Sequence, residues 1–238
     1  MRFLNLTLPS LFENLGLDEA LLLEAEAGAS GEALRCWAWP WPAVVLGAGG
    51  VIADDVDEAA CTAGGVPLAR RSSGGGTVLL GSGCLNFSLI LDIDSCPPLQ
   101  QIGTSYRFIL GRVANCLADL LPGIEPAGTS DLAAEGRKFS GNSQQRKRRF
   151  ILHHGTILHR FDLNLIGRYL RLPTRRPDYR ADRPHADFLM NLPARPANLV
   201  ARLRKEWAAT EESGEWPEAR VRQLVDEKFG LEEWVRRR

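Results

Sequence analysis

The sequence lacks an excess of charge of either sign, because 29 lysines and arginines balance 29 aspartates and glutamates. A formal net charge of zero excludes a global field that would draw the protein onto nucleic acid or a membrane surface. We therefore expect neither nucleic acid nor a membrane among its partners. Any attraction for an anionic ligand must come from a local arrangement of residues.

Long apolar runs are missing as well. The N-terminal stretch MRFLNLTLPSLFENLG has neither the apolar core nor the small-residue cleavage site of a signal peptide. No segment reaches the roughly 18 apolar residues that a membrane-spanning helix needs. The five cysteines are scattered, without a CxxC pair that would indicate zinc or redox chemistry. Buried free thiols in a reducing compartment are the simplest interpretation, so we expect a cytoplasmic protein.

Helical and strand periodicities are both present and are interleaved. Helices are predicted at residues 12–28, 54–64 and 102–120, the last with apolar residues spaced alternately by four and three positions. Strands are predicted at residues 34–47, 66–70, 77–80, 85–91 and 150–161. Because Pro40 and Pro42 interrupt the first of these, it should lie at a sheet edge or contain a bend. The pattern predicts an α+β fold with a mixed, largely antiparallel sheet flanked by helices.

The C-terminal third changes in composition. Residues 171–197 are crowded with proline and arginine, which is typical of a loop, and the chain from residue 198 onward has a helical pattern. We interpret residues 1–238 as one domain, in which residues 198–238 form a helical tail, without a large accessory domain.

A run of three glycines follows two arginines in RRSSGGGTV, residues 70–78. After a strand, bare glycine backbone exposes N–H groups, and such a nest flanked by Arg70 and Arg71 suits a phosphate or carboxylate. The stretch fits neither the P-loop pattern nor the dinucleotide fingerprint. The alternative is a tight hairpin whose arginines are solvated.

Lys138 lies in a segment bounded by glycine and serine, DLAAEGRKFSGNSQ, residues 131–144. A lysine in this setting is placed to meet a phosphoryl group as a point charge. The alternative is a solvent-exposed lysine in a turn, as most lysines are.

Three further features are weaker signals. The run QQRKRRF, residues 144–150, has no interleaved aromatics and is interpreted as a hairpin tip or a docking point for an acidic partner, rather than a nucleic-acid site. In HHGTILH, strand alternation places His153 and His159 on one face and His154 on the other, which argues against zinc. A histidine that touches a ligand or holds the backbone is favoured. Cys84 has no local partner that would activate it and is expected to be a small buried thiol.

These pieces, in this order, resemble one family. RRSSGGGTV, a hairpin ending in CLNFSLIL, GRKFSGNSQ and HHGTIL are similar to the catalytic domain of lipoate–protein ligases, which octanoyltransferases share and biotin–protein ligases share more distantly. The early NLGLDEALL and PAVVLG fit as well, so the resemblance covers roughly residues 10–165. The resemblance implies a ligase that activates lipoate or octanoate with ATP and Mg²⁺ and then acylates a lysine. The implied acceptor is the H protein of glycine cleavage or an E2 subunit of a 2-oxoacid dehydrogenase.

The resemblance also implies roles for residues. Lys138 would be catalytic, binding the α-phosphate and the acyl carbonyl, and Asp131 would help to position Mg²⁺ or the incoming lysine, with no metal held by the protein alone. ATP and adenylate would contact Arg71, Ser73, Gly74, Gly75, Gly76, Thr77, Val78, Leu79 and Asp131. The lipoyl group would contact Val78, Phe87, Ser140, Gly141, His154 and Gly155.

Three departures from the family pattern bear on the activity. Ligases commonly carry His-Asp where this chain has Leu80-Gly81, and they commonly carry a further C-terminal domain, which a separate accessory subunit could supply. Octanoyltransferases use a cysteine after the HHGT-like strand, whereas the last cysteine here is Cys116. The position of the last cysteine therefore favours an adenylating ligase over an octanoyltransferase. Leu80-Gly81 keeps open the alternative of a non-catalytic relative that binds acyl or adenylate ligands. A biotin ligase is less favoured, because its loop is richer in arginine.

Overall fold

The computed structural model describes residues 1–174 and 176–238. Within them the strands form a large sheet in the order β11-β1-β2-β6-β10-β9-β8-β7 and a small sheet in the order β4-β3-β5. The strands are β1 Arg2–Asn5, β2 Ala33–Trp37, β3 Ala43–Leu46, β4 Leu68–Arg70, β5 Val78–Leu80, β6 Cys84–Asp92, β7 Glu125–Ala127, β8 Asp131–Ala134, β9 Arg137–Arg146, β10 Phe150–Leu158 and β11 Glu211–Glu212. In the large sheet β1 pairs in parallel with β2 and β11, and the other neighbouring pairs are antiparallel. The predicted fold class is confirmed.

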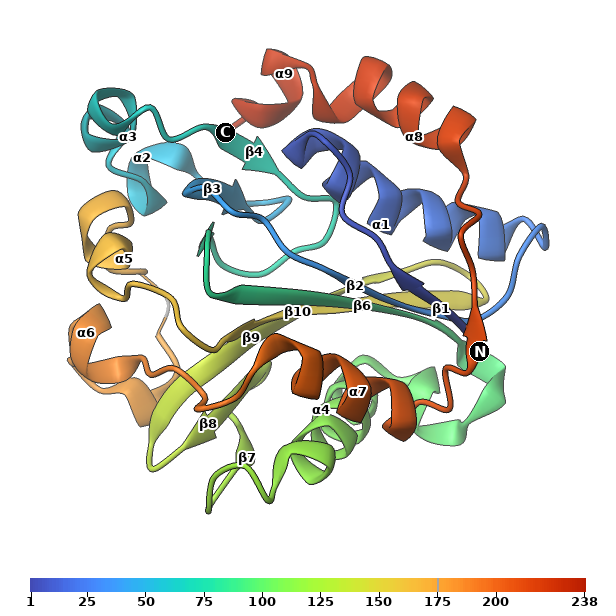
Figure 1. Cartoon of the computed structure of the whole chain (residues 1–238). Helices are drawn as coiled ribbons and strands as arrows, with labels where there is room; N and C mark the ends of the chain where they lie inside the picture. Colours follow the sequence, from blue (N-terminus) through green and yellow to red (C-terminus); the bar gives the residue numbers. More distant parts are fainter. Residues whose placement is uncertain (175) are drawn as a thin grey trace.

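Helices cover both faces of the large sheet (Figure 1). They are α1 Leu11–Glu26, α2 Ile52–Asp55, α3 Glu58–Gly64, α4 Ile102–Leu117, α5 Asn164–Tyr169, α6 His185–Phe188, α7 Pro196–Glu206, α8 Glu218–Leu224 and α9 Glu232–Val235, with a π-helical turn at Val225–Phe229. On one face lie α1, α8 and α9, together with the small sheet, while α4 and α7 lie on the other face. The cleft described below opens beside the small sheet.

Local sequence signals account for the main elements. A capping box starts α1: the Ser10 side chain accepts from the Glu13 backbone N–H, and the Glu13 side chain accepts from the Ser10 backbone N–H. The apolar stripe of α4 packs into the core that it shares with α7 and the alternate apolar residues of β6, namely Leu85, Phe87, Leu89 and Leu91. Asn86 and Ser88 consequently lie on the opposite face of the sheet, as the alternation predicts.

Several predicted elements are divided in the structure. The stretch 34–47 forms two strands, β2 and β3, which lie inside different sheets, so the edge interpretation is wrong and the proline break is confirmed. The stretch 54–64 forms two short helices, because Asp57 caps a new helix with its side chain. Residues 131–146, whose glycines and serines conceal a strand pattern, form β8 and β9 and place Lys138 on a strand rather than in a turn.

The segment from residue 198 onward packs on both faces of the sheet. Leu199 and Leu203 of α7, and Trp207 directly after it, join the core beneath α4. The helices that follow turn to the other face, where Val221 and Phe229 pack against α1. None of the helices in the described part of the chain combines the length and apolar character needed to cross a membrane.

Candidate active site

Arg71 shapes the glycine loop between β4 and β5 from within. Its Nε donates to Ser73 Oγ at 3.0 Å, and its Nη2 donates to the carbonyl oxygens of Gly74 at 2.5 Å and Gly76 at 2.8 Å. Gly75 has φ +81°, in the region that favours glycine, and a Cβ there would lie 3.1 Å from Arg71 Nη2. Burial lowers the pKa of Arg71 to about 10. The loop is therefore a fixed structure and not a linker.

Arg70 does not face the cleft, so its predicted share in an anion nest is wrong. Its guanidinium donates to the carbonyl oxygens of Gly47 at 2.9 Å, Gly50 at 2.7 Å and Val235 at 2.8 Å. The Trp234 indole N–H donates back to the Arg70 carbonyl at 2.9 Å. This arginine therefore anchors the C-terminal segment to β4.

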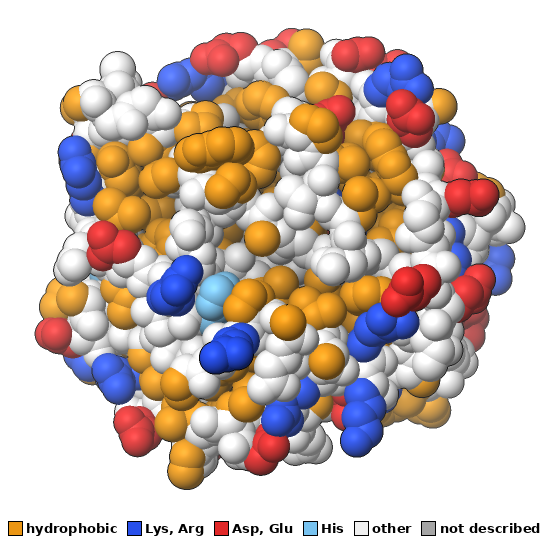
Figure 2. Space-filling view, in the orientation of Figure 1, with side chains coloured by type: hydrophobic (Ala, Val, Ile, Leu, Met, Phe, Trp, Pro, Cys, Tyr) orange, Lys and Arg blue, Asp and Glu red, His pale blue; other side chains and the backbone are white. Residues whose placement is uncertain are grey.

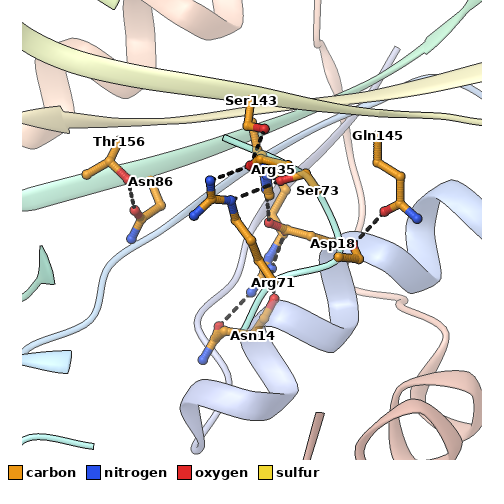
Figure 3. Close-up of polar contacts among 12 residues, drawn as sticks. Asn14, Asp18, Arg35, Arg71, Ser73, Asn86, Ser143, Gln145 and Thr156 are labelled. Carbon is orange, nitrogen blue, oxygen red and sulfur yellow. Dashed lines mark hydrogen bonds and ion pairs between the residues drawn. The ribbon is translucent and has the colours of Figure 1, made fainter. Parts of the chain in front are cut away.

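A chain of buried polar contacts runs beneath the loop (Figure 3). Ser73 Oγ lies 2.5 Å from His154 Nε2, and His154 Nδ1 lies 3.2 Å from Asp18 Oδ2. The other Asp18 oxygen pairs with Arg35 Nη1 at 2.7 Å. Burial would raise the pKa of Asp18, but the Arg35 charge and then the His154 contact outweigh it and lower that pKa. The chain joins β10 and α1 to the glycine loop.

Lys138 lies at the other end of the site and is paired. Its Nζ lies 2.7 Å from Asp131 Oδ1, while Asp131 Oδ2 accepts a hydrogen bond from the Tyr179 hydroxyl at 2.8 Å. Lys138 Nζ lies directly over Gly141, where a Cβ would come within 2.9 Å of it. Gly141, the second glycine of GRKFSGN, thus leaves room for the lysine head group. Packing therefore explains why the motif has a glycine at this position.

An inner cavity of about 120 Å³ lies between the large sheet, the glycine loop and α1. Its floor includes two rows of residues that lie side by side on neighbouring strands: Trp37, Asn86, Thr156 and Gly141 in the first row, and Ser88, His154 and Ser143 in the second. Leu15, Val45, Val78 and Leu80 line it from the opposite side. The cavity therefore has a polar floor and an apolar ceiling, to which Leu80 contributes.

An outer cavity of about 440 Å³ adjoins the inner one, and both share Gly76, Thr77, Val78, Asp131 and Lys138 as lining residues. Basic residues from the segment after β10 also line the outer cavity: Arg171, Arg176, Arg180 and His185. Within the described part of the chain, Nη2 of the buried Arg180 has no hydrogen-bond partner. The outer cavity thus offers cationic donors of the kind that bind phosphate groups.

The predicted site residues fall into four groups. Arg71, Phe87, His154 and Gly155 line the inner cavity alone, Leu79 and Ser140 line the outer one alone, and Gly76, Thr77, Val78, Asp131, Lys138 and Gly141 line both. Ser73, Gly74 and Gly75 line neither and instead hold the loop. The Phe87 ring stacks on His153 in the core on the opposite face of the sheet, with centroids 6.3 Å apart. Phe87 therefore borders the inner cavity, but its ring lies in the core and does not extend into that cavity.

The residues present fit a nucleotide better than a resident metal ion. Among the described residues, no group of three histidine, cysteine or carboxylate side chains could hold a metal. Both oxygens of Asp131 already have partners in Lys138 and Tyr179. Asp55, whose Oδ2 accepts from Thr77 Oγ1 at 2.6 Å, is a second carboxylate on the outer cavity. One or two carboxylates of this kind suit Mg²⁺ that arrives on nucleotide phosphates.

Sequence reasoning missed several lining residues. Asp18 looks like an ordinary helix acid, and its burial follows only from the packing of α1 on the sheet. Thr156 is part of the HHGT motif and could have been found from the alternation that places it with His154. The crowding of arginine and proline at residues 171–183 was the available signal for the outer cavity.

The other sequence hypotheses are resolved by position. The basic run lies at the tip of the β9–β10 hairpin, where the backbone N–H groups of Arg149 and Phe150 donate to Glu26. The hairpin interpretation is thus confirmed. His153 and His154 lie on opposite faces as predicted, and His159 lies just beyond the strand. Cys84 is buried, and burial raises its pKa to about 12.

The surface agrees with a balanced charge. Figure 2 shows basic and acidic side chains interspersed around the rim of one face, with apolar side chains across its centre. No extended patch of one charge sign covers the face in view. The basic residues that could bind an anion are those that line the outer cavity.

A family model described as "Lipoyl protein ligase A/B catalytic domain" matches residues 10–193. The chain belongs to this family. It is therefore a member of the lipoate ligase and octanoyltransferase group, and the resemblance drawn from RRSSGGGTV and GRKFSGNSQ is confirmed.

Relatives within the family carry out different reactions. An octanoyltransferase LipM of Symbiobacterium thermophilum is 28% identical over 95% of this chain and 94% of its own length. Lipoate–protein ligase 1 of Staphylococcus aureus is 26% identical over 71% of this chain and 48% of its own length. Membership of the family alone therefore does not decide whether the chain acts as an octanoyltransferase or as a lipoate–protein ligase.

Solved structures match nearly the whole chain. A lipoate–protein ligase A bound with ATP superposes with a TM-score of 0.82 at 25% identity, covering 99% of this chain and 98% of that one. A bipartite lipoate protein ligase of Thermoplasma acidophilum, described with its E2 lipoyl domain, superposes with a TM-score of 0.82 at 24% identity, covering 99% and 95%. The second likeness shows the fold alone.

Proposed function

We propose that the protein is an ATP-dependent lipoate–protein ligase, which activates lipoate or octanoate as the acyl-adenylate and transfers the acyl group to a lysine of a lipoyl acceptor domain. The observation that carries the proposal is the position of Lys138, which lies where the inner and outer cavities meet. A carboxylate reaching this point from the inner cavity would meet a phosphate reaching it from the outer cavity.

The first step forms an O–P bond. A carboxylate oxygen of the acid attacks the α-phosphorus of ATP, here a substrate, and pyrophosphate leaves with the electron pair of the broken P–O bond. Lys138 would stabilise the negative charge that develops between the two reactants. Arg171, Arg176 and Arg180 are placed to bind the departing phosphates from the outer cavity.

The second step forms the amide. The neutral ε-amine of the acceptor lysine attacks the acyl carbonyl, AMP leaves, and the amine loses a proton. Lys138 would stabilise the oxyanion of the tetrahedral intermediate, and its partner Asp131 is placed to orient the incoming amine. Removing the Lys138 charge therefore affects both steps.

The cysteines support ATP rather than a thioester enzyme intermediate. Of the described residues that line the two cavities, none is a cysteine. Burial raises the pKa of Cys36 and Cys84 to about 12, so neither is a thiolate near neutral pH. The arginines of the outer cavity match a polyphosphate group.

A second candidate function is transfer of octanoate from an acyl carrier protein without ATP. It is favoured by the identity of 28% with an octanoyltransferase along almost the full chain. A non-catalytic relative that binds acyl or adenylate ligands remains the third candidate, on the strength of Leu80-Gly81.

Pyrophosphate release tests the proposal. With ATP, Mg²⁺ and lipoate or octanoate, we expect release, followed by a mass increase of a lipoyl acceptor domain. Lys138→Ala should reduce the rate about 100- to 1,000-fold, the usual loss for one oxyanion-stabilising donor. Lys147→Ala at the exposed hairpin tip is the matched control and should keep the rate.

Octanoyl-carrier protein supplied in place of ATP distinguishes the candidates. Acylation of the acceptor without ATP would identify the octanoyltransferase, and tight adenylate binding without any acylation would identify the non-catalytic relative. A Lys138→Ala variant with the normal rate would refute the assignment of Lys138.

The proposal also includes an acceptor protein, a domain organisation and a cellular compartment. The acceptor would be the H protein or an E2 subunit, as the E2 lipoyl domain described with the Thermoplasma ligase supports. We propose that residues 1–238 act as one catalytic domain, to which an accessory subunit could add in the transfer step. The five free cysteines fit a reducing compartment, which leads us to place the reaction in the cytoplasm.

A further inference from the structure

The first row of the cavity floor leads away from Lys138 across the sheet. Gly141 pairs with Thr156, Thr156 pairs with Asn86, and Asn86 pairs with Trp37. Because residues directly opposite one another share a face, all four border the inner cavity. Neighbouring strands lie about 4.8 Å apart, so Asn86 lies about 10 Å and Trp37 about 14 Å from Gly141 along the row.

The direction of this row places the carboxylate of a bound acid at one end and its tail at the other. Lys138 Nζ lies over Gly141, which fixes the position of the carboxylate at that end of the row. An aliphatic chain attached to that carboxylate then passes Thr156 and brings its distal half beside Asn86 and Trp37. The apolar ceiling of Leu15, Val45 and Leu80 would cover its methylene groups.

Two hydrogen-bond donors at the distal end have no partner among the described residues. They are Nδ2 of Asn86 and the indole N–H of Trp37, and each of these side chains belongs to a residue only 4% exposed. The Thr156 hydroxyl donates to Asn86 Oδ1 at 2.7 Å, which fixes the amide with its oxygen toward Thr156 and its nitrogen on the far side (Figure 3). A buried donor without a partner is costly, and most buried polar groups in proteins have one.

We propose that the preferred substrate is a medium-chain carboxylic acid with a hydrogen-bond acceptor in the distal half of its tail, bound by Asn86 Nδ2 and by the Trp37 indole. This inference rests on the proposed function for the position of the carboxylate. A saturated chain such as octanoate would leave both donors unpaired. Lipoate, whose sulfur atoms are weak acceptors, falls between octanoate and an acid with a distal carbonyl group.

The size of the preference follows from the chemistry of such sites. A site built to hydrogen-bond a substrate group discriminates strongly against the analogue that lacks it, because its own polar groups are left unpaired. We expect a keto analogue of octanoate, with its carbonyl beside the terminal methyl group, to exceed octanoate about tenfold or more in kcat/KM for pyrophosphate release. Lipoate should lie between the two.

Asn86→Leu tests the assignment of the donor. Leucine has a similar volume and no donor, so the ratio of kcat/KM between the keto acid and octanoate should fall about threefold or more, mainly through KM, while the Trp37 indole retains part of the preference. Asn115→Leu, the same change on the exposed surface of α4 beyond the opposite face of the sheet, should keep the ratio of the unchanged protein. Asn86→Ala is the second variant, should the leucine disturb folding.

Calorimetric binding of the same acids in the absence of ATP separates the two hypotheses. Tighter binding of the keto acid that Asn86→Leu weakens supports the inference, even if no acid releases pyrophosphate. A lack of pyrophosphate release would refute only the ligase proposal. Equal or tighter binding of octanoate, or a preference that Asn86→Leu leaves unchanged, would overturn the inference while pyrophosphate release still supported the ligase.

Discussion

Around the inner cavity, the two faces of the large sheet come from alternate residues of the same strands and are both buried, yet they have opposite character. On the face beneath α4 and α7, β6 presents leucines and a phenylalanine to an apolar core. On the face beneath the glycine loop it presents Asn86 and Ser88, beside His154 of β10. Burial alone therefore does not make a hydrophobic core, and the polar face is kept for a ligand.

Each face is stabilised in a different way. The apolar face depends on close packing, in which each lost methylene costs transfer energy and leaves a cavity. The polar face depends on complete hydrogen bonding around buried charges: besides its pair with Asp18, Arg35 donates to the carbonyl oxygens of Leu6 and Asn14 and to the Asn14 side chain. Mutations that break one arrangement should leave the other intact.

The largest effect is expected from Asp18→Ala on the polar face. Removing this carboxylate leaves the Arg35 guanidinium buried without its counter-charge, which should lower the free energy of unfolding by about 3–5 kcal/mol. Urea denaturation at neutral pH measures the loss. The double change Asp18→Leu with Arg35→Met should recover much of it, because it removes both charges. A loss below about 1 kcal/mol would show that water reaches the pair.

On the apolar face, Leu89→Ala should lower the free energy of unfolding by about 3 kcal/mol, because Leu89 is fully buried. Since the core lies across the sheet from the cavity, kcat/KM per folded molecule should stay unchanged. Leu231→Ala, at an exposed leucine, is the matched control and should cost about 0.5 kcal/mol or less. A Leu89 variant that is stable but inactive would contradict the separation of the two faces.

His153 should make the apolar face sensitive to acid. Burial, and then the neighbouring His154, lower its pKa from 6.5 to about 3. The unfolded chain therefore binds a proton that the folded one does not between these two pH values, so stability falls as pH falls below about 6.5. Between pH 6.5 and pH 5 this group alone should cost about 2 kcal/mol.

A His153→Gln variant measures that contribution. Its unfolding free energy should depend less on pH over this interval than that of the unchanged protein, with urea denaturation at both pH values as the readout. Identical pH dependence in the two proteins would mean that another group carries the acid sensitivity.

Prediction from the sequence succeeded where a signal is local. The alternation in CLNFSLIL assigned Asn86 and Ser88 to the face opposite the core, and the paired histidines were assigned to opposite faces. It failed where a side chain's partner is distant in the chain. Arg70 and Arg71 are adjacent and chemically identical, yet one binds carbonyls near residue 235 and the other binds the glycine loop.

The sequence by itself determined the α+β class, which depends on short-range periodicity, and the family, through the resemblance of the motifs around Arg71 and Lys138. Only the tertiary structure decided which residues share a cavity. The row from Gly141 through Thr156 and Asn86 to Trp37 draws on four strands in which the ends are about a hundred positions apart. Register between strands is a property of the folded sheet, and it is register that turns scattered polar residues into the floor of one site.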